Sequence, residues 1–164
     1  MTDLTILGSV RKQDGLGTVH LEDVYATDID DLWSAITTPE RLARWLVTVN
    51  GDTAPGNWFG ASFTSNWDGK LRVDECDAPH HLTLHATDGE SDTVMEAWLT
   101  TEGDGTRLVV EERGLVLEDV GYHGSGWQTH LEDLASEVAG KTPNPWEPRW
   151  RELTPTYLDL AKNL

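Results

Sequence analysis

The sequence predicts an α+β domain in which an antiparallel sheet packs against one long helix. Three observations support this prediction. Two short helix patterns follow one another directly over residues 27–46, short strand patterns separated by turns occupy residues 59–113, and one long helix pattern covers residues 121–139. The chain has 164 residues, which suffices for one domain with its own core, so residues 1–164 are expected to form a single unit.

The segment TDIDDLWSAITTPERLARWL, residues 27–46, has the spacing of two short helices. The first apolar stripe recurs at i, i+3, i+4 and i+7 and consists of Ile29, Leu32, Trp33 and Ile36. After it, Thr38 can cap a new helix and Pro39 suits its first position. The second stripe consists of Leu42, Trp45 and Leu46. The sequence therefore predicts two helices joined without a true loop.

Strand patterns lie on both sides of this helix pair. The first covers residues 18–26, and five more cover residues 59–67, 70–76, 81–86, 93–101 and 106–113. Turn sequences such as Asp68-Gly69 and Asp88-Gly89 separate the strands, which is typical of an antiparallel meander. Residues 1–17 show little periodicity and are expected to form an N-terminal arm. Residues 47–58 are expected to be turns.

The long helix pattern has one apolar face, formed by Trp127, Leu131, Leu134 and Val138, and Gly140 ends it. Residues 18–140 are thus expected to be the core of the domain. Residues 141–164 form a Pro-rich C-terminal extension with a short helix over 156–164. Trp146 and Trp150 in this extension either clamp it onto the body or present an aromatic face to a second subunit, and we prefer the clamp.

Several segments resemble a known family. They are LWSAITTPERLARWL at 32–46, DAPHHL at 77–82, GTRL at 105–108, and Gly126-Trp127 followed by Leu131 and Leu134. Together with the order of elements, they resemble the bacterial members of the family of C-terminal domains of activators of the 90-kDa heat-shock protein ATPase, within the START-like (SRPBCC) superfamily. The resemblance implies a helix-grip fold, in which a curved antiparallel sheet wraps around the long C-terminal helix over an internal cavity.

This cavity and the aromatic residues around it predict binding of a small apolar or amphipathic molecule. Trp98 and Trp127 are expected to face one another across it. Core packing is the alternative for each aromatic residue, above all for Trp33 in its helix stripe. The expected ligand-binding residues are Trp33, Phe63, Trp67, Trp98, His123, Trp127, His130, Leu131 and Leu134.

His130 is the best polar candidate in this set, because it lies near Trp127 and Leu134 on the long helix. It is expected to orient a ligand, or to act as a general base with a pKa near neutrality. The resemblance adds an enzymatic alternative, since related helix-grip proteins include cyclases and aromatases of polyketides. The third interpretation is that His130 makes an ordinary hydrogen bond at the edge of the helix. His123 joins the same face if the helix begins that early.

The other polar groups are weaker candidates for a functional site. Strand alternation sends His81 and His85 away from Leu82 and Leu84, so no metal site is expected there. The adjacent carboxylates Asp74-Glu75 and Glu111-Glu112 point to opposite faces of their strands and are expected to be solvated or locally paired. Cys76 is expected to be a half-buried strand residue without special reactivity. The sequence contains no phosphate loop or dinucleotide motif, so no cofactor is expected.

The net charge of −17 arises from 29 acidic side chains against 12 Lys and Arg. Such a field repels phosphate backbones and anionic lipids, so neither nucleic acid nor membrane is an expected partner. One cysteine and the absence of a signal-peptide pattern favour the cytoplasm. A homodimer formed through the extension is the assembly we consider. Regulation of a chaperone through the outer surface is the third functional alternative, weakened because the large N-terminal domain of eukaryotic activators is missing.

Overall fold

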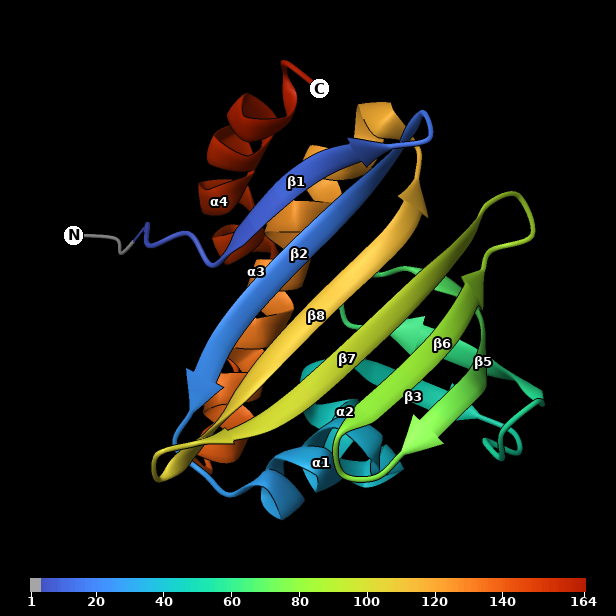
Figure 1. Cartoon of the computed structure of the whole chain (residues 1–164), viewed down its shortest axis with the longest axis vertical. Helices are drawn as coiled ribbons and strands as arrows, with labels where there is room; N and C mark the ends of the chain where they lie inside the picture. Colours follow the sequence, from blue (N-terminus) through green and yellow to red (C-terminus); the bar gives the residue numbers. More distant parts are fainter. Residues whose placement is uncertain (1–3) are drawn as a thin grey trace.

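The computed structural model describes residues 4–164 and shows an eight-stranded antiparallel sheet that curves around a long helix (Figure 1). The strand order across the sheet is β1-β2-β8-β7-β6-β5-β4-β3. The elements are β1 (Gly8–Gln13), β2 (Leu16–Tyr25), α1 (Ile29–Thr37), α2 (Pro39–Trp45), β3 (Val47–Asn50), β4 (Trp58–Phe63), β5 (Asp68–Asp77), β6 (His81–Thr87), β7 (Asp92–Glu102), β8 (Gly105–Leu115), the 3₁₀ helix η1 (Leu117–Asp119), α3 (Val120–Val138) and α4 (Trp146–Ala161). This arrangement confirms the predicted helix-grip fold.

The predicted helix pair is present as α1 and α2, which lie at one end of the sheet (Figure 1). Asp28 caps α1 by accepting a hydrogen bond from the backbone N–H of Asp31 at 2.8 Å. Pro39 occupies the first turn of α2, where its missing N–H costs nothing. The indole of Trp45 on α2 donates a hydrogen bond to the carbonyl of Ala35 on α1 at 2.9 Å, and this bond ties the two helices together.

Strand alternation divides the sheet into an inner apolar face and an outer polar face. On β8, Leu108 and Val110 are buried against the core, whereas Glu111 points outward. Glu111 accepts hydrogen bonds from His20, Arg11 and Arg113 on the outer face. Burial alone would raise the pKa of Glu111, but these three partners lower it to about 2.

Helix α3 lies along the inner face of the sheet, and α4 packs beside it (Figure 1). The two helices approach closely at Gly124, where a Cβ would lie 2.5 Å from Cδ1 of Tyr157. The hydroxyl of Tyr157 donates to the buried side chain of Gln128 at 2.6 Å. Gln128 also accepts from the backbone of Leu7, so one α3 side chain joins α4 to the N-terminal segment.

Three segments differ from the sequence-based expectation. The expected N-terminal arm is wrong for residues 8–17, because β1 pairs with β2 from Gly8 to Gln13; residues 1–3 of that arm lie outside the described residues. Within residues 47–58, expected as turns, β3 pairs with β4. The C-terminal helix begins at Trp146 instead of residue 156.

None of the helices in residues 4–164 is long and apolar enough to span a membrane.

Candidate functional site

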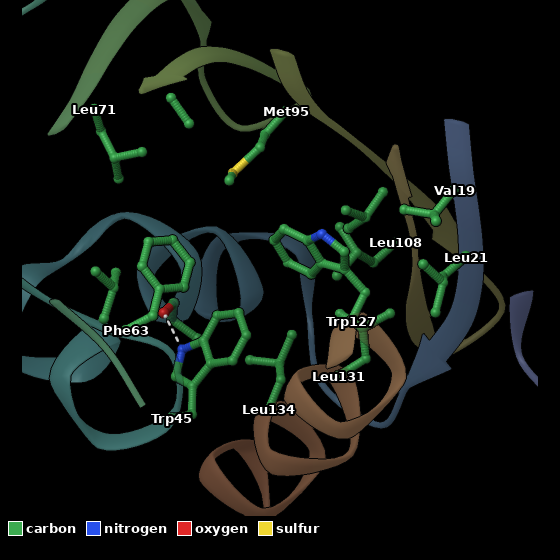
Figure 2. Packing of buried hydrophobic residues seen from close by; sticks show 14 of the residues in the cluster. Val19, Leu21, Trp45, Phe63, Leu71, Met95, Leu108, Trp127, Leu131 and Leu134 are labelled. Atoms are coloured by element: carbon green, nitrogen blue, oxygen red, sulfur yellow. Dashed lines mark hydrogen bonds between the residues drawn. The ribbon is translucent and has the colours of Figure 1, made fainter. Parts of the chain in front are cut away.

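The inner face of the sheet encloses a central cavity of about 230 Å³. It lies between the helix pair, strands β3 to β8 and α3, and most of its lining is aliphatic or aromatic. Figure 2 shows Phe63, Met95, Trp127 and Leu131 among the buried side chains of this region. Among the described residues that line it, Glu96 is the single charged one, and its carboxylate pairs with His81 and Arg113 on the outer face. The cavity therefore offers an apolar surface.

The central cavity opens on one side. Most of its lining residues are buried or half-buried, but Pro39, Pro55 and Cys76 are exposed. These three residues come from α2, from the segment between β3 and β4, and from β5. The lining of the cavity therefore reaches the protein surface between these elements. Cys76, expected to be half-buried, is thus an exposed free thiol that lines the cavity.

A second pocket, which we call the α4 pocket, has a volume of about 380 Å³ and lies between the sheet, α3 and α4. Its lining residues are Phe63, Ser65, Asn66, Trp67, Met95, Glu112, Tyr122, His123, Gly126, Trp127, His130, Trp146, Glu147 and Trp150. Phe63, Met95 and Trp127 also line the central cavity. These three side chains form the partition between the two spaces.

Glu112 is the buried charge of the α4 pocket. Its side chain accepts hydrogen bonds from Nε1 of Trp127 and from Oγ1 of Thr93, both at 2.8 Å, and Nδ1 of His123 lies 3.6 Å away. Burial alone would raise the pKa of Glu112, but His123 and the two donors outweigh it and lower the pKa. Burial likewise opposes protonation of His123, but Glu112 raises the pKa of His123 above its ordinary value. The pocket therefore holds an ionised carboxylate next to an imidazole that readily takes a proton.

Of the two states expected for Glu112, solvated or locally paired, the first is wrong, since this residue is only 4% exposed, and the second holds, since Trp127, Thr93 and His123 surround its carboxylate. Strand alternation already contained the signal. Glu112 lies two residues beyond Val110 and four beyond Leu108, on the apolar face of β8. Adjacent carboxylates on opposite faces require that one of them points inward.

His130 lies between aromatic rings, with ring centroids 5.8 Å from Trp127 and 5.4 Å from Trp146. It is buried, and this burial lowers its pKa to about 3. The expected pKa near neutrality is therefore wrong, and the imidazole is neutral around pH 7. A neutral imidazole can orient a ligand through one hydrogen bond, but it is a weak proton acceptor.

The structure brings most of the predicted ligand-binding residues together. The residues that line one or both pockets are Phe63, Trp67, His123, Trp127, His130 and Leu131. Leu134 is buried in the core, and Trp33 packs against that core from α1; neither lines one of these two pockets.

The expected position of Trp98 opposite Trp127 is wrong. Trp98 pairs in register with His81 and stacks on its ring at 5.8 Å, on the outer face of the sheet. The cause is alternation on β7, where Met95 and Leu99 are buried and Trp98 is therefore directed outward.

The strand histidines are placed as expected on the outer face, where His81 contacts Glu96 and His85 contacts Asp74. Within residues 4–164, no three His, Cys, Asp or Glu side chains come together in a way that would hold a metal ion.

A family model described as "Activator of Hsp90 ATPase homolog 1-like protein" matches residues 26–139. No curated protein matches the sequence.

Solved structures share the fold at low sequence identity. The crystal structure of CalU16 from Micromonospora echinospora is 22% identical, with a TM-score of 0.75 over 94% of this chain and 96% of CalU16. MLL2253 from Mesorhizobium loti is 22% identical, with a TM-score of 0.69 over 75% of this chain and 97% of its own. DynU16, described as a protein in the dynemicin biosynthetic locus, is 20% identical, with a TM-score of 0.70 over 77% of this chain and 48% of DynU16.

Proposed function

This chain belongs to the Activator of Hsp90 ATPase homolog 1-like family, and on this premise we propose that it binds a small apolar or amphipathic molecule in the central cavity. The observation that supports the proposal is the apolar cavity of about 230 Å³ with an opening beside Pro39, Pro55 and Cys76. The helix-grip fold shared with CalU16 and DynU16 is consistent with a ligand-binding role.

Burial of apolar surface drives binding in this proposal. Removing ligand surface from water contributes about 25 cal/mol per Å², and aromatic walls such as Phe63 and Trp127 provide large contact areas. Pockets for drug-sized ligands typically measure roughly 300–1,000 Å³, so the central cavity suits a ligand at or below the small end of that class. Small molecules that are uncharged, including short-chain ones with an uncharged polar end, suit this lining better than molecules whose charge would be buried on binding.

The test uses the two faces of β7. Ala97 lines the central cavity, whereas its neighbour Trp98 lies on the outer face. Ala97→Phe fills the cavity and should weaken binding of a neutral fluorescent probe, N-phenyl-1-naphthylamine, by tenfold or more. Trp98→Ala is the matched control and should bind the probe as the unchanged protein does. Circular dichroism shows whether each variant is folded.

The single cysteine gives a second, independent readout. Because Cys76 lies at the opening of the central cavity, a bound probe should slow its reaction with a maleimide. Unchanged probe affinity in folded Ala97→Phe, together with an unchanged rate at Cys76, would refute the assignment of this cavity.

The other interpretations stay predictions. An acid–base enzyme of the cyclase type fits His130 poorly because of its low pKa, and would have to use His123 beside Glu112. Three further predictions come from the sequence alone: contact with a chaperone, a homodimer formed through α4, and a cytoplasmic location.

A further inference from the structure

The α4 pocket combines aromatic walls with buried negative charge. Six of its fourteen lining residues are aromatic, and they come from the β4–β5 region, α3 and α4: Phe63, Trp67, Tyr122, Trp127, Trp146 and Trp150. The faces of aromatic rings carry negative electrostatic potential, which attracts cations. The same walls exclude water and bury the hydrocarbon part of a ligand.

The charges around the pocket favour a cation over an anion. Two lining residues carry carboxylates: Glu112, which is buried, and Glu147, which is exposed and pairs with Arg151. No Lys or Arg is found among the lining residues that the structure describes. His130 is neutral, and the whole chain has a net charge of −17. A ligand carboxylate or phosphate would meet repulsion here, whereas an ammonium group would be attracted from a distance and inside the pocket.

Glu112 has the capacity for one more partner. An ionised carboxylate offers about four acceptor positions. The donors of Trp127 and Thr93 fill two of them at 2.8 Å. The group that can carry a positive charge, Nδ1 of His123, lies 3.6 Å from the carboxylate. Because Trp127 and Thr93 hold the carboxylate in place, the site is preorganised for a positive group, and no rearrangement of Glu112 is needed.

We propose that the α4 pocket binds an organic ammonium ion, with Glu112 as its counter-ion and the surrounding indole rings as its walls. The site is separate from the central cavity across the partition of Phe63, Met95 and Trp127, and it does not depend on a ligand in that cavity.

Protonated His123 competes with such a ligand for Glu112. Glu112 on β8 and Asp119 in η1 both stabilise the imidazolium, Glu147 on α4 faces the same pocket, and His130 stays neutral. Below the pKa of His123 the carboxylate is already paired, and above it the carboxylate is free for the ligand. Affinity for a permanent cation should therefore rise as the pH increases through this pKa.

The experiment compares two molecules of the same shape, phenyltrimethylammonium and tert-butylbenzene, by isothermal titration calorimetry. The cation should bind at least tenfold more tightly. Glu112→Gln, which preserves the shape of the side chain and an acceptor for Trp127, should remove this preference. Glu118→Gln removes one exposed carboxylate outside the pocket and should retain it. In His123→Gln, the increase of cation affinity with pH should disappear.

Circular dichroism and cooperative urea unfolding serve as the check on folding of Glu112→Gln, because neither depends on a ligand in the central cavity. Equal affinity for the two isosteric ligands, no detectable binding of the cation, or an unchanged preference in folded Glu112→Gln would each overturn the proposal. None of these outcomes affects the test with Ala97→Phe, so failure of one proposal is distinguishable from failure of the other.

Discussion

His130 is enclosed by aromatic rings, and its charge state decides how the protein responds to acid. Burial lowers its pKa to about 3, whereas the ordinary value for histidine is about 6.5. Between these values the unfolded chain binds a proton on this imidazole and the folded chain does not. Stability therefore falls as the pH decreases from about 6.5 toward about 3.

Replacing His130 with phenylalanine should remove this source of acid sensitivity. Phenylalanine keeps a ring between Trp127 and Trp146 but has no proton to bind. Between pH 7 and pH 4, the free energy of unfolding of the unchanged protein should fall by roughly 3 kcal/mol more than that of His130→Phe. Urea unfolding at the two pH values measures this difference. Parallel losses in both proteins would show that His130 is accessible to protons in the folded state.

Single residues were predicted well where one helix face decided their environment. Trp127, His130 and Leu131 share the face of α3 that the sequence singled out, and all three line a pocket. Prediction failed on the strands for Trp98 and for the burial of Glu112. The face on which each side chain lies depends on which residues of the same strand are buried, and residue type alone does not reveal this. The pKa of His130 also needed the structure, because α4 supplies part of its cover.

At the scale of elements, the packing of α4 on α3 depends on glycines that look unfavourable in a helix. A Cβ at Gly124 would lie 2.5 Å from the buried ring of Tyr157, whereas a Cβ at Gly126 would lie 3.6 Å from Trp146, an ordinary contact distance. In a helix interior, alanine is more favourable than glycine by about 1 kcal/mol. The gain in helix propensity is therefore the same at both positions, and only the space available for a Cβ differs.

We expect Gly126→Ala to stabilise the protein by about 0.5–1 kcal/mol and Gly124→Ala to destabilise it by about 1–2 kcal/mol. The clash at Gly124 outweighs the gain in helix propensity, because the Tyr157 hydroxyl is held by Gln128 and the ring cannot move freely. Thermal unfolding of the two variants provides the comparison, and each is the control for the other. Stabilisation by both changes would mean that α4 packs less closely than the structure shows.

Elements with their own apolar periodicity were predicted, and elements held by their neighbours were not. The helix pair and α3 carry clear stripes, and both were placed to within a few residues. β1 is an edge strand with mostly exposed side chains, so its backbone pairing with β2 leaves little trace in the sequence. The start of α4 was missed because Pro148 reads as a break, although it lies in the first turn, where no backbone donor is required.

For the whole molecule, the order of helices and strands predicted the helix-grip fold, whereas the family resemblance also needed particular segments, such as residues 32–46 and 77–82. The division of the interior into two pockets was not predicted. That division depends on the partition of Phe63, Met95 and Trp127, which come from β4, β7 and α3. It also depends on α4, whose first turns were not expected to be helical. Contacts between such distant segments have no local pattern.

The net charge of −17 acts on the whole molecule and sets its response to salt. Repulsion among like charges destabilises the compact state, while the ion pairs of the outer face, such as those of Glu111, stabilise it. Exposed ion pairs contribute roughly 0–1 kcal/mol each and weaken in salt. The excess of negative charge remains unpaired, and at low salt it interacts over a screening length of about 30 Å at 0.01 M, against about 3 Å at 1 M. Repulsion should therefore dominate, and the melting temperature should rise as NaCl increases from 0.01 to 1 M.

A variant with less charge separates this effect from general effects of salt. Glu90 and Glu118 are exposed, and replacing both with lysine raises the net charge by four. This double variant should melt at a higher temperature than the unchanged protein in 0.01 M NaCl and should gain less on addition of salt. A melting temperature that falls with salt in both proteins would show that the ion pairs outweigh the repulsion. In that case the acidic surface would be a stabilising network, with its arginines as the essential members.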